Sequence, residues 1–478
     1  MPSAGPSTAT VSPEPGASRA GVRFRMPHAL VMMLLIIVAS VALTWVVPSG
    51  TYQRQAGGLV VPGTYHGVSK DYAGSLLHPA GGAAVVAYPA SPLAIVSAVP
   101  RGMVQTAPLI FMILFIGGMF GVLEETGALG AGIERLLAMT RGNVYVLAPL
   151  LMLVLASGST FLGLISEYLV VIPIVVVLAE RLDLDALFAT ALVTIAAKIG
   201  YMTSVTNPLA VVVAQRIVGV PLFTGAGFRL ITFVLYLAIG IAYLLRYVRR
   251  TTKGRRAEVT FSDARLSRRH VAILLVLLAS ILVMVYGAQQ LHWKDNDLAA
   301  MYLFMGLAIA AVGGLGSRAA AQGFLKGMQT MVLAAVLVGL AAAVEVILKD
   351  GMILDSIIAF LTRMAQGKPP VVVAQMMVFI EMIIDVFIPS TSGKAAVTMP
   401  ILGPIGQLSG LGGAITVQAF IFGNGLTNAI TPTSGMLLAY LATGKVSYGE
   451  WARFVLPLLA ILTVLSLLFI SGAVLVGY

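Results

Sequence analysis

Apolar runs recur along this chain from residue 28 to its end, and their length constrains the fold more than any other feature. Most of them hold roughly 17–25 residues, the number that a helix needs to cross a ~30 Å hydrocarbon core. Charged residues make up only 10% of the 478 residues, whereas soluble proteins carry about 25%. The pattern predicts an all-α polytopic membrane protein that contacts membrane lipid.

The formal net charge of +11 comes from arginines and lysines that gather at the ends of the apolar runs, most densely in 246–270. Because positively charged loops stay on the cytoplasmic side of a membrane, we expect this segment in the cytoplasm. A patch for nucleic acid or anionic lipid is the alternative, but the position at span ends favours topology, and we expect no nucleic-acid partner. The absence of cysteine excludes disulfides, thiolate metal sites and cysteine nucleophiles.

The chain divides into four predicted segments. Residues 1–25, rich in Pro, Ser, Gly and Ala, are expected to form a disordered cytoplasmic tail. Residues 26–247 form the first half, whose first apolar run, 28–48, is too long for a secretory signal and reads as an uncleaved span. A basic cytoplasmic linker at 248–270 leads to the second half, 271–478.

Two apolar blocks of the first half are interrupted by polar residues. The block 144–180 is broken at 157–160 and 166–167, which leaves limbs of about 13–15 residues, or roughly 20 Å of helix. Limbs this short predict a re-entrant helical hairpin that enters and leaves from the cytoplasm; two tight full spans with polar kinks are the alternative. The next block, 186–218, is broken at 203–208, where a proline removes a backbone donor.

The second half repeats this order of elements. A block split at 389–394 follows the amphipathic stretch 352–366, and a further block is interrupted at 424–428 and 431–435. Matched residues lie 224 or 227 positions apart: Gly127 and Gly351, Pro208 and Pro432, Pro173 and Pro400. An odd number of full crossings separates the copies, so we predict two inverted repeats, each with a re-entrant hairpin and a discontinuous transmembrane helix. This pattern is typical of secondary transporters.

Broken helices expose backbone groups that can bind solutes. Free N–H groups at a helix start suit a carboxylate, and unwound carbonyls with hydroxyl and amide oxygens suit Na⁺. We therefore predict a substrate-binding set: Ser159, Thr160, Thr206, Asn207, Ser390, Thr391, Ser392, Lys394, Asn428, Thr431, Thr433 and Ser434. The predicted Na⁺ ligands are Ser157, Thr203, Asn207, Asn424 and Asn428. In the alternative, these side chains only cap helix ends or bond back to the helix; four clusters at repeat-related positions favour binding.

Ionisable residues inside apolar segments are costly and therefore point to function. The candidates for coupling or ion pairing are Glu167, Lys198, Glu381 and Asp385. If the hairpin prolines are aligned, Glu167 occupies the place of Lys394. This alignment suggests an ion pair between these two residues across the repeat axis. The alternative is that each charge snorkels or bonds to local carbonyls.

Several motifs together resemble the YfcC-type members of the anaerobic C4-dicarboxylate carrier family, within the ion-transporter group that includes divalent anion/sodium symporters. They are VPSGTY at 47–52, VPGTYH at 61–66, TNP at 206–208, IPSTSGK at 388–394 with TMP at 398–400, and TPTSG at 431–435. The resemblance covers nearly the whole chain from about residue 23. It implies a homodimer that works as an elevator, with a scaffold part and a moving part, in the inner (plasma) membrane of a bacterium with the N-terminus in the cytoplasm. It also implies cation-coupled carriage of carboxylates, although relatives described as arginine/ornithine carriers belong to the same group.

The leading functional hypothesis is a secondary active, cation-coupled transporter of small carboxylate metabolites, with C4-dicarboxylates first and Lys394 supplying positive potential. The alternative substrate is a basic amino acid, whose cationic head would face Glu167, Glu381 or Asp385. We expect Na⁺ or H⁺ as the coupling ion and no cofactor. A pump is disfavoured because no nucleotide-binding loop occurs, and an enzyme because the histidines lie in tails, loops or span ends and no HExxH occurs. A channel would differ by flux that does not saturate.

Overall fold

The computed structural model describes residues 29–54, 60–73, 86–132, 135, 143–252, 267–291 and 293–478. The expectations for the tail 1–25 and for most of the linker 248–270 therefore concern residues outside the described part. The described chain is mostly helical, and eight of its helices are long and apolar enough to cross a membrane. The predicted class, an all-α polytopic membrane protein, is confirmed at this level.

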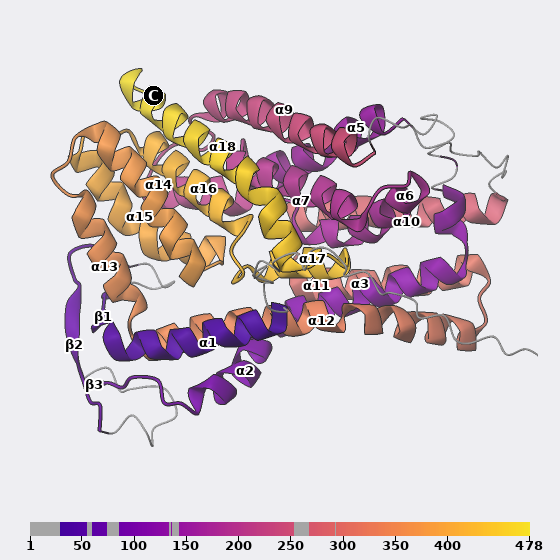
Figure 1. The fold of residues 1–478 in the computed structure, drawn as a ribbon, viewed down its shortest axis with the longest axis horizontal. Coiled ribbons are helices and arrows are strands. Elements are labelled where there is room, and N and C mark those ends of the chain that lie inside the picture. The colour runs from indigo at the N-terminus through magenta and orange to yellow at the C-terminus, as the bar shows by residue number, and fades with distance from the viewer. Residues whose placement is uncertain are drawn as a thin grey trace, which may run out of the picture.

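One layer of the molecule is built on a single long helix, α12 (Ser317–Asp350). It packs mainly against α1 (Ala29–Val46), α2 (Ala94–Gln105), α3 (Ala107–Glu125) and α17 (Gly435–Thr443). Helix α11 (Asp295–Gly313) joins this layer through α3, and α10 (Arg268–Gln290) packs on α11. Figure 1 shows α1, α3, α11 and α12 side by side along one edge of the molecule.

Glycines allow α3 and α12 to approach until their backbones touch. A Cβ atom on Gly121 would lie 2.0 Å from the carbonyl oxygen of Gly323, and one on Gly327 would lie 2.0 Å from that of Gly117. Both helices thus carry two small residues four apart at the crossing, the spacing used for close helix packing in membranes. This contact fixes α3 and α12 as one rigid pair.

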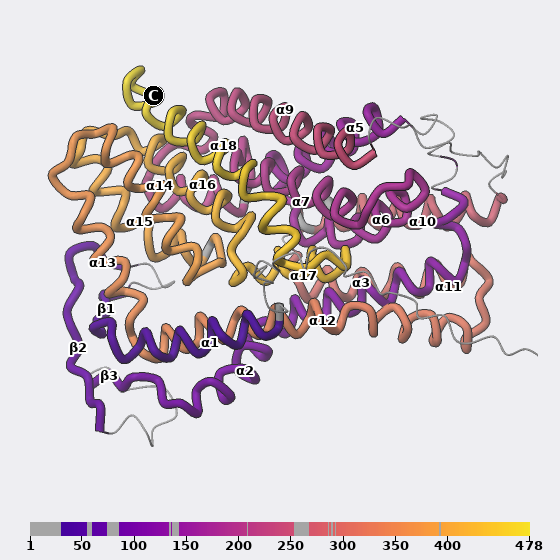
Figure 2. The backbone as a smooth tube through the Cα atoms, in the orientation of Figure 1, coloured from indigo at the N-terminus to yellow at the C-terminus, as the bar shows by residue number. Residues whose placement is uncertain are grey.

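The other helices, together with α17, form a second body that holds all the broken elements and contacts the first layer through α17. Its first-half helices are α5 (Val144–Ser157), α6 (Val171–Arg181), α7 (Ala186–Thr203), α8 (Val213–Val218) and α9 (Ala226–Thr251). Its second-half helices are α13 (Leu354–Ala365), α14 (Pro370–Phe387), α15 (Thr391–Leu408), α16 (Gly413–Asn428), α17 and α18 (Tyr448–Leu475). The tube in Figure 2 shows the second-half helices α14, α16 and α18 next to one another, with α7 and α9 alongside.

A small sheet lies at one end of the molecule, in the segment between α1 and α2. Strand β1 (Ser49–Thr51) pairs antiparallel with β2 (His66–Lys70), which pairs parallel with β3 (Val86–Ala87). The sheet is tied to the second half because Ser49 Oγ donates to the carbonyl of Gly351 at 2.6 Å. In addition, the Arg54 guanidinium pairs with Asp355 of α13 at 2.8 Å.

The predicted interruptions are present, with altered bounds. The first hairpin breaks into a π-helical turn, Gly158–Leu162, and a 3₁₀ turn, Ser166–Val170. Helix α7 ends at Thr203, and the chain resumes helical form at Pro208. The second hairpin breaks only at 388–390, so Lys394 lies in the first turn of α15.

The interruption expected at 424–428 is wrong, because α16 runs unbroken to Asn428 and the gap lies at 429–434. The reason is that Asn424 and Asn428, four apart on one face of the helix, direct their amides to the neighbouring hairpin instead of to their own backbone.

Candidate functional site

The break after α7 is held by its own side chains. Ser204 ends the helix with φ of +40°, a left-handed conformation that costs a residue with a side chain about 1 kcal/mol. Three residues later, the Asn207 amide oxygen accepts from the backbone N–H groups of Leu209 and Ala210, at 2.8 and 3.2 Å. This N-cap starts the second helical piece and satisfies two of its free donors.

The tip of the first hairpin closes on this break through neutral hydrogen bonds. The hydroxyls of Thr160 and Thr203 are 3.1 Å apart, and the Val205 N–H donates to Thr160 Oγ1 at 3.0 Å. Asn207 Nδ2 donates to the Ser159 carbonyl at 3.3 Å. These side chains are fully buried except that of Thr206, whose hydroxyl donates to the Phe161 carbonyl at 3.0 Å.

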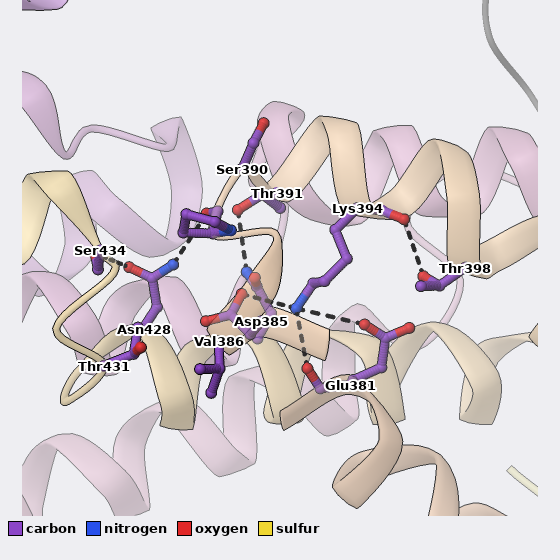
Figure 3. A network of polar contacts seen from close by, with 12 residues as sticks. Glu381, Asp385, Val386, Ser390, Thr391, Lys394, Thr398, Asn428, Thr431 and Ser434 are labelled. Carbon is purple, nitrogen blue, oxygen red and sulfur yellow. Dashed lines mark hydrogen bonds and ion pairs between the residues drawn. The ribbon is translucent and has the colours of Figure 1, made fainter. Parts of the chain in front are cut away.

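The second hairpin closes on the break between α16 and α17 in a related way. Asn424 Nδ2 donates to Thr391 Oγ1 at 3.1 Å, and Asn428 Nδ2 donates to the Pro389 carbonyl at 3.2 Å. On the far side of the break, Thr433 Oγ1 donates to the Val386 carbonyl at 2.7 Å. Figure 3 shows Asn428, Thr431 and Ser434 grouped beside the end of α14 and the start of α15.

Among the contacts that join the first half to the second inside the body, two connect the polar breaks. The Tyr201 hydroxyl donates to Thr391 Oγ1 at the second hairpin tip. The Lys198 ammonium donates to Asn428 Oδ1 at 2.8 Å, and Lys198 is only 3% exposed. The two breaks therefore share one polar interior.

A buried ionic cluster lies beside the second break. The Lys394 ammonium is 2.8 Å from Asp385 Oδ1 and 3.4 Å from Glu381 Oε2, and all three residues have zero exposure. Figure 3 shows Lys394 reaching from α15 back to both carboxylates on α14. Within the described part of the chain, neither oxygen of Glu381 and only one oxygen of Asp385 accepts a hydrogen bond.

The structure brings most of the predicted site residues together, but not all. Ser390 is exposed and caps α15 through the Gly393 N–H at 3.3 Å. Ser157, half-buried, precedes the π-helical turn. The side chain of Ser392 lies outside the described part.

The ion pair considered between Glu167 and Lys394 is wrong. Lys394 pairs with Asp385 and Glu381 on its own hairpin, whereas the Glu167 carboxylate accepts from the Ile165 N–H at 3.0 Å. A carboxylate two residues from its partner N–H closes a local turn at no cost in loop entropy, so the local bond is formed instead.

Sequence reasoning missed Tyr201 and Arg229. Tyr201 lies in an apolar stretch and looks like an ordinary core residue. Arg229 is fully buried in α9, and its Nε donates to the Val205 carbonyl in the first break at 3.2 Å. An arginine within the first turn of an apolar run was the available signal, since such a residue needs a buried partner.

A cavity of about 470 Å³ reaches the second hairpin from the sheet end of the molecule. Its wall includes Ile388 and Gly393, which flank the tip, and charged groups of both signs from Arg54, Asp355 and Lys349. Cavities of roughly 300–1,000 Å³ are the usual size for small-molecule sites. The tip of the second hairpin is thus next to a space large enough for a small metabolite.

A multi-span helical bundle with two polar breaks in its interior belongs to the class of solute transporters. The chain belongs to the family described as C4-dicarboxylate anaerobic carrier, whose model matches residues 26–475. It is therefore a membrane transporter and not an enzyme, and the resemblance noted in its motifs is confirmed.

Two relatives match this chain over nearly their whole length. The chain is 29% identical to a protein of Escherichia coli strain K12 described as putative basic amino acid antiporter YfcC, over 95% of this chain and 98% of that protein. It is 26% identical to an uncharacterised protein of Haemophilus influenzae, over 94% and 97% of the respective lengths.

Two solved transporters are similar over nearly the full length, each at 17% identity. They are YdaH of Alcanivorax borkumensis, with a TM-score of 0.42, covering 95% of this chain and 99% of that one, and MtrF of Neisseria gonorrhoeae, with a TM-score of 0.40, covering 94% and 95%. Scores this low carry no argument about the site.

Proposed function

We propose that this protein is a secondary active transporter that exchanges basic amino acids across the membrane. The observation that carries the proposal is the shared polar interior, in which each hairpin tip bonds the break of its own half and Lys198 and Tyr201 join the two. Irregular backbone at membrane depth is tolerated where it is buried in protein or lines a cavity, and in carriers it serves as the solute site.

The charges of this interior favour a cationic substrate. Lys394 was expected to attract an anionic solute, but it is enclosed by Asp385 and Glu381 and has no exposed surface. All three side chains are buried, and the atoms of this cluster that lack a hydrogen-bond partner in the described part of the chain are carboxylate oxygens of Glu381 and Asp385, which suit a cation better than an anion. The E. coli relative is described as a putative basic amino acid antiporter, which supports the same choice.

A C4-dicarboxylate is the second candidate, because the family description names that substrate class. Its carboxylates would bind the free N–H groups where α15 and α17 begin, both capped by serine hydroxyls. In either case the predicted hydroxyl and amide residues at the breaks would bind the substrate, and those assigned to Na⁺ would take the coupling cation if that ion is Na⁺.

The architecture we propose for transport is an elevator with two inverted repeats. The layer of α1, α3, α11 and α12 would serve as the fixed scaffold and dimer contact, and the body with the broken elements would move. The close glycine contact of α3 and α12 supports a rigid scaffold. We place the carrier in a bacterial inner membrane with its N-terminus in the cytoplasm, as the basic segment 246–270 indicates.

Uptake by the purified protein in proteoliposomes tests the function. Vesicles loaded with unlabelled arginine should take up labelled arginine with saturation, and succinate should neither enter nor compete. Saturable succinate uptake without arginine exchange would replace the proposal by its second candidate. Linear, non-saturating flux of either solute would indicate a channel.

A further inference from the structure

We propose that Lys198 supplies an exchangeable positive charge to the interior, and that its proton is the ion this carrier exchanges for the cationic substrate. The inference rests on the proposed function and deepens it by naming the coupling ion. It also gives a role to a buried lysine whose partner lies in the other half of the chain.

The Lys198 contact occupies the amide oxygen of Asn428, one of the Na⁺ ligands predicted from the sequence. Asn428 Oδ1 accepts from Lys198 Nζ and from Ser434 Oγ, each at 2.8 Å. An amide oxygen has two acceptor positions, so both are in use and none is left for Na⁺. The ammonium of Lys198 thus takes the place beside Asn428 that the sequence analysis assigned to a sodium ion.

The charge balance of the interior depends on this proton. When both are ionised, Asp385 and Glu381 carry two negative charges, and Lys394 forms ion pairs with both of them. A second positive charge comes from Lys198, which is buried and donates to the neutral amide of Asn428. Buried charge without compensation is costly, so the cluster requires one further cation besides Lys394.

No other group near Lys198 in the described part of the chain offers that charge. Of the helices that pack on α7, α16 has no ionisable residue, and those of α5, α6 and α18 lie toward the helix ends. The buried groups on the others bond elsewhere: Arg229 of α9 to the Val205 carbonyl through Nε, with its two Nη atoms unpartnered in the described part of the chain, Tyr236 of α9 to Ser466, and Tyr440 of α17 to the Ile165 carbonyl. On α7 itself, Tyr201 bonds Thr391.

The exchange of substrate for proton then follows because the cationic substrate and the charged Lys198 exclude each other. When a cationic side chain enters beside Asp385, two positive charges compete for one place, and Lys198 gives its proton to water on the open side. When the substrate leaves, Lys198 takes a proton from water and restores its bond to Asn428. One proton moves out for each cationic substrate that moves in, and the net charge of the interior is unchanged.

Proteoliposomes with the wild-type protein provide the first test, without Na⁺ and with a pH dye in the lumen. Adding arginine outside should make the lumen more alkaline, and a lumen one pH unit more acidic than the medium should drive about tenfold accumulation, since one unit corresponds to a factor of ten for one-to-one exchange. An imposed membrane potential should not change the accumulation.

Variants locate the proton at Lys198. Lys198→Met should lose the accumulation entirely, whatever rate of arginine exchange it keeps. Lys198→Arg carries a charge that it cannot release, so it should lose arginine exchange as well. Lys326→Met, at an exposed lysine of α12, is the matched control and should accumulate arginine like the wild type.

The outcomes separate the two proposals. Saturable arginine exchange that requires Na⁺, or that moves no protons, overturns the role of Lys198 and leaves the carrier function standing. No arginine exchange at all by the wild type overturns both. Proton-coupled accumulation that persists in Lys198→Met would show that Lys198 does not carry the exchanged proton. If the variants fail to fold, the wild-type measurement still decides whether protons are the coupling ion.

Discussion

The hairpin and broken helix of the first half, 144–218, and those of the second half, 370–443, close similar breaks with different chemistry. In the first, the contacts between tip and break run between hydroxyls, an amide and backbone groups, such as Thr160 with Thr203. In the second, amide contacts are joined by a buried ammonium between two carboxylates on α14. The only carboxylate at the first tip, Glu167, is half-buried and turned to its own backbone.

This difference suggests a division of labour between the two units. Neutral contacts hold the first hairpin tip on the first break, and the one buried charge bonded to that break in the described part of the chain is Arg229, on the Val205 carbonyl. Buried charges make the second break sensitive to any cation that enters, because each added or removed charge must be balanced in a poorly solvated interior. The contact of Lys198 with Asn428 links the two, so a change of charge in the second unit is felt by the first.

The largest effect is expected from Lys394→Met, which leaves two carboxylates facing each other without their cation. Breaking a buried ion pair costs about 3–5 kcal/mol, so thermal unfolding in detergent should occur at a markedly lower temperature. The triple variant Lys394→Met, Asp385→Asn, Glu381→Gln removes all three charges and should recover much of that loss. An unchanged melting temperature for the single variant would show that the cluster is not ionic.

Amide removal at the breaks should abolish transport with a smaller loss of stability. Asn207→Ala removes the cap on Leu209 and Ala210, for about 1 kcal/mol, and Asn428→Ala removes the partner of Lys198. Both variants, and Thr431→Ala, should reach the membrane at normal levels and carry no substrate. Normal transport by all three would refute the assignment of the site to the breaks.

The link between the units predicts a moderate effect for Tyr201→Phe. Loss of its hydrogen bond to Thr391 should cost about 0.5–1.5 kcal/mol and raise the KM of transport, because the second tip is then less firmly placed. Tyr286→Phe, at a tyrosine that is 60% exposed on α10, is the control and should behave as the wild type. Equal KM values for both variants would show that the units work independently.

The smallest effect is expected at the sheet end of the molecule, where Arg54 lines the cavity that reaches the second hairpin. Arg54→Ala removes a partly exposed pair with Asp355, and such pairs contribute about 0.2–1 kcal/mol. The difference in melting temperature from the wild type should shrink at high salt, where exposed charges are screened. Arg318→Ala, at an exposed arginine of α12, should show no such salt-dependent difference.

Much of the fold could be predicted from the sequence because the length and hydropathy of a membrane helix are local properties of its own residues. Span length, the short limbs of the hairpins and the proline breaks placed nearly every helix, including the gaps at 204–207 and 388–390. Errors arose where side chains bond across elements. Asn424 and Asn428 looked like helix breakers, yet both lie within α16 because their amides bond the other hairpin.

The site followed the same rule. The identity of its polar residues was available from the sequence, because hydroxyls, amides and charges inside apolar segments are rare and costly. The pairing of these residues was not available. Aligning the two hairpins suggested Glu167 as the ion-pair partner of Lys394, whereas in the structure its partners are Asp385 and Glu381. The role of Tyr201 had no local signal at all.

The sequence alone determined that this chain is a multi-span helical protein with two polar breaks, because hydrocarbon permits only continuous helices and any departure must be marked by polar or helix-breaking residues. Only the tertiary structure decided which charge meets which. Such partners can lie far apart along the chain, 230 positions for Lys198 and Asn428 and 301 for Arg54 and Asp355, and no local pattern encodes the packing that brings them together.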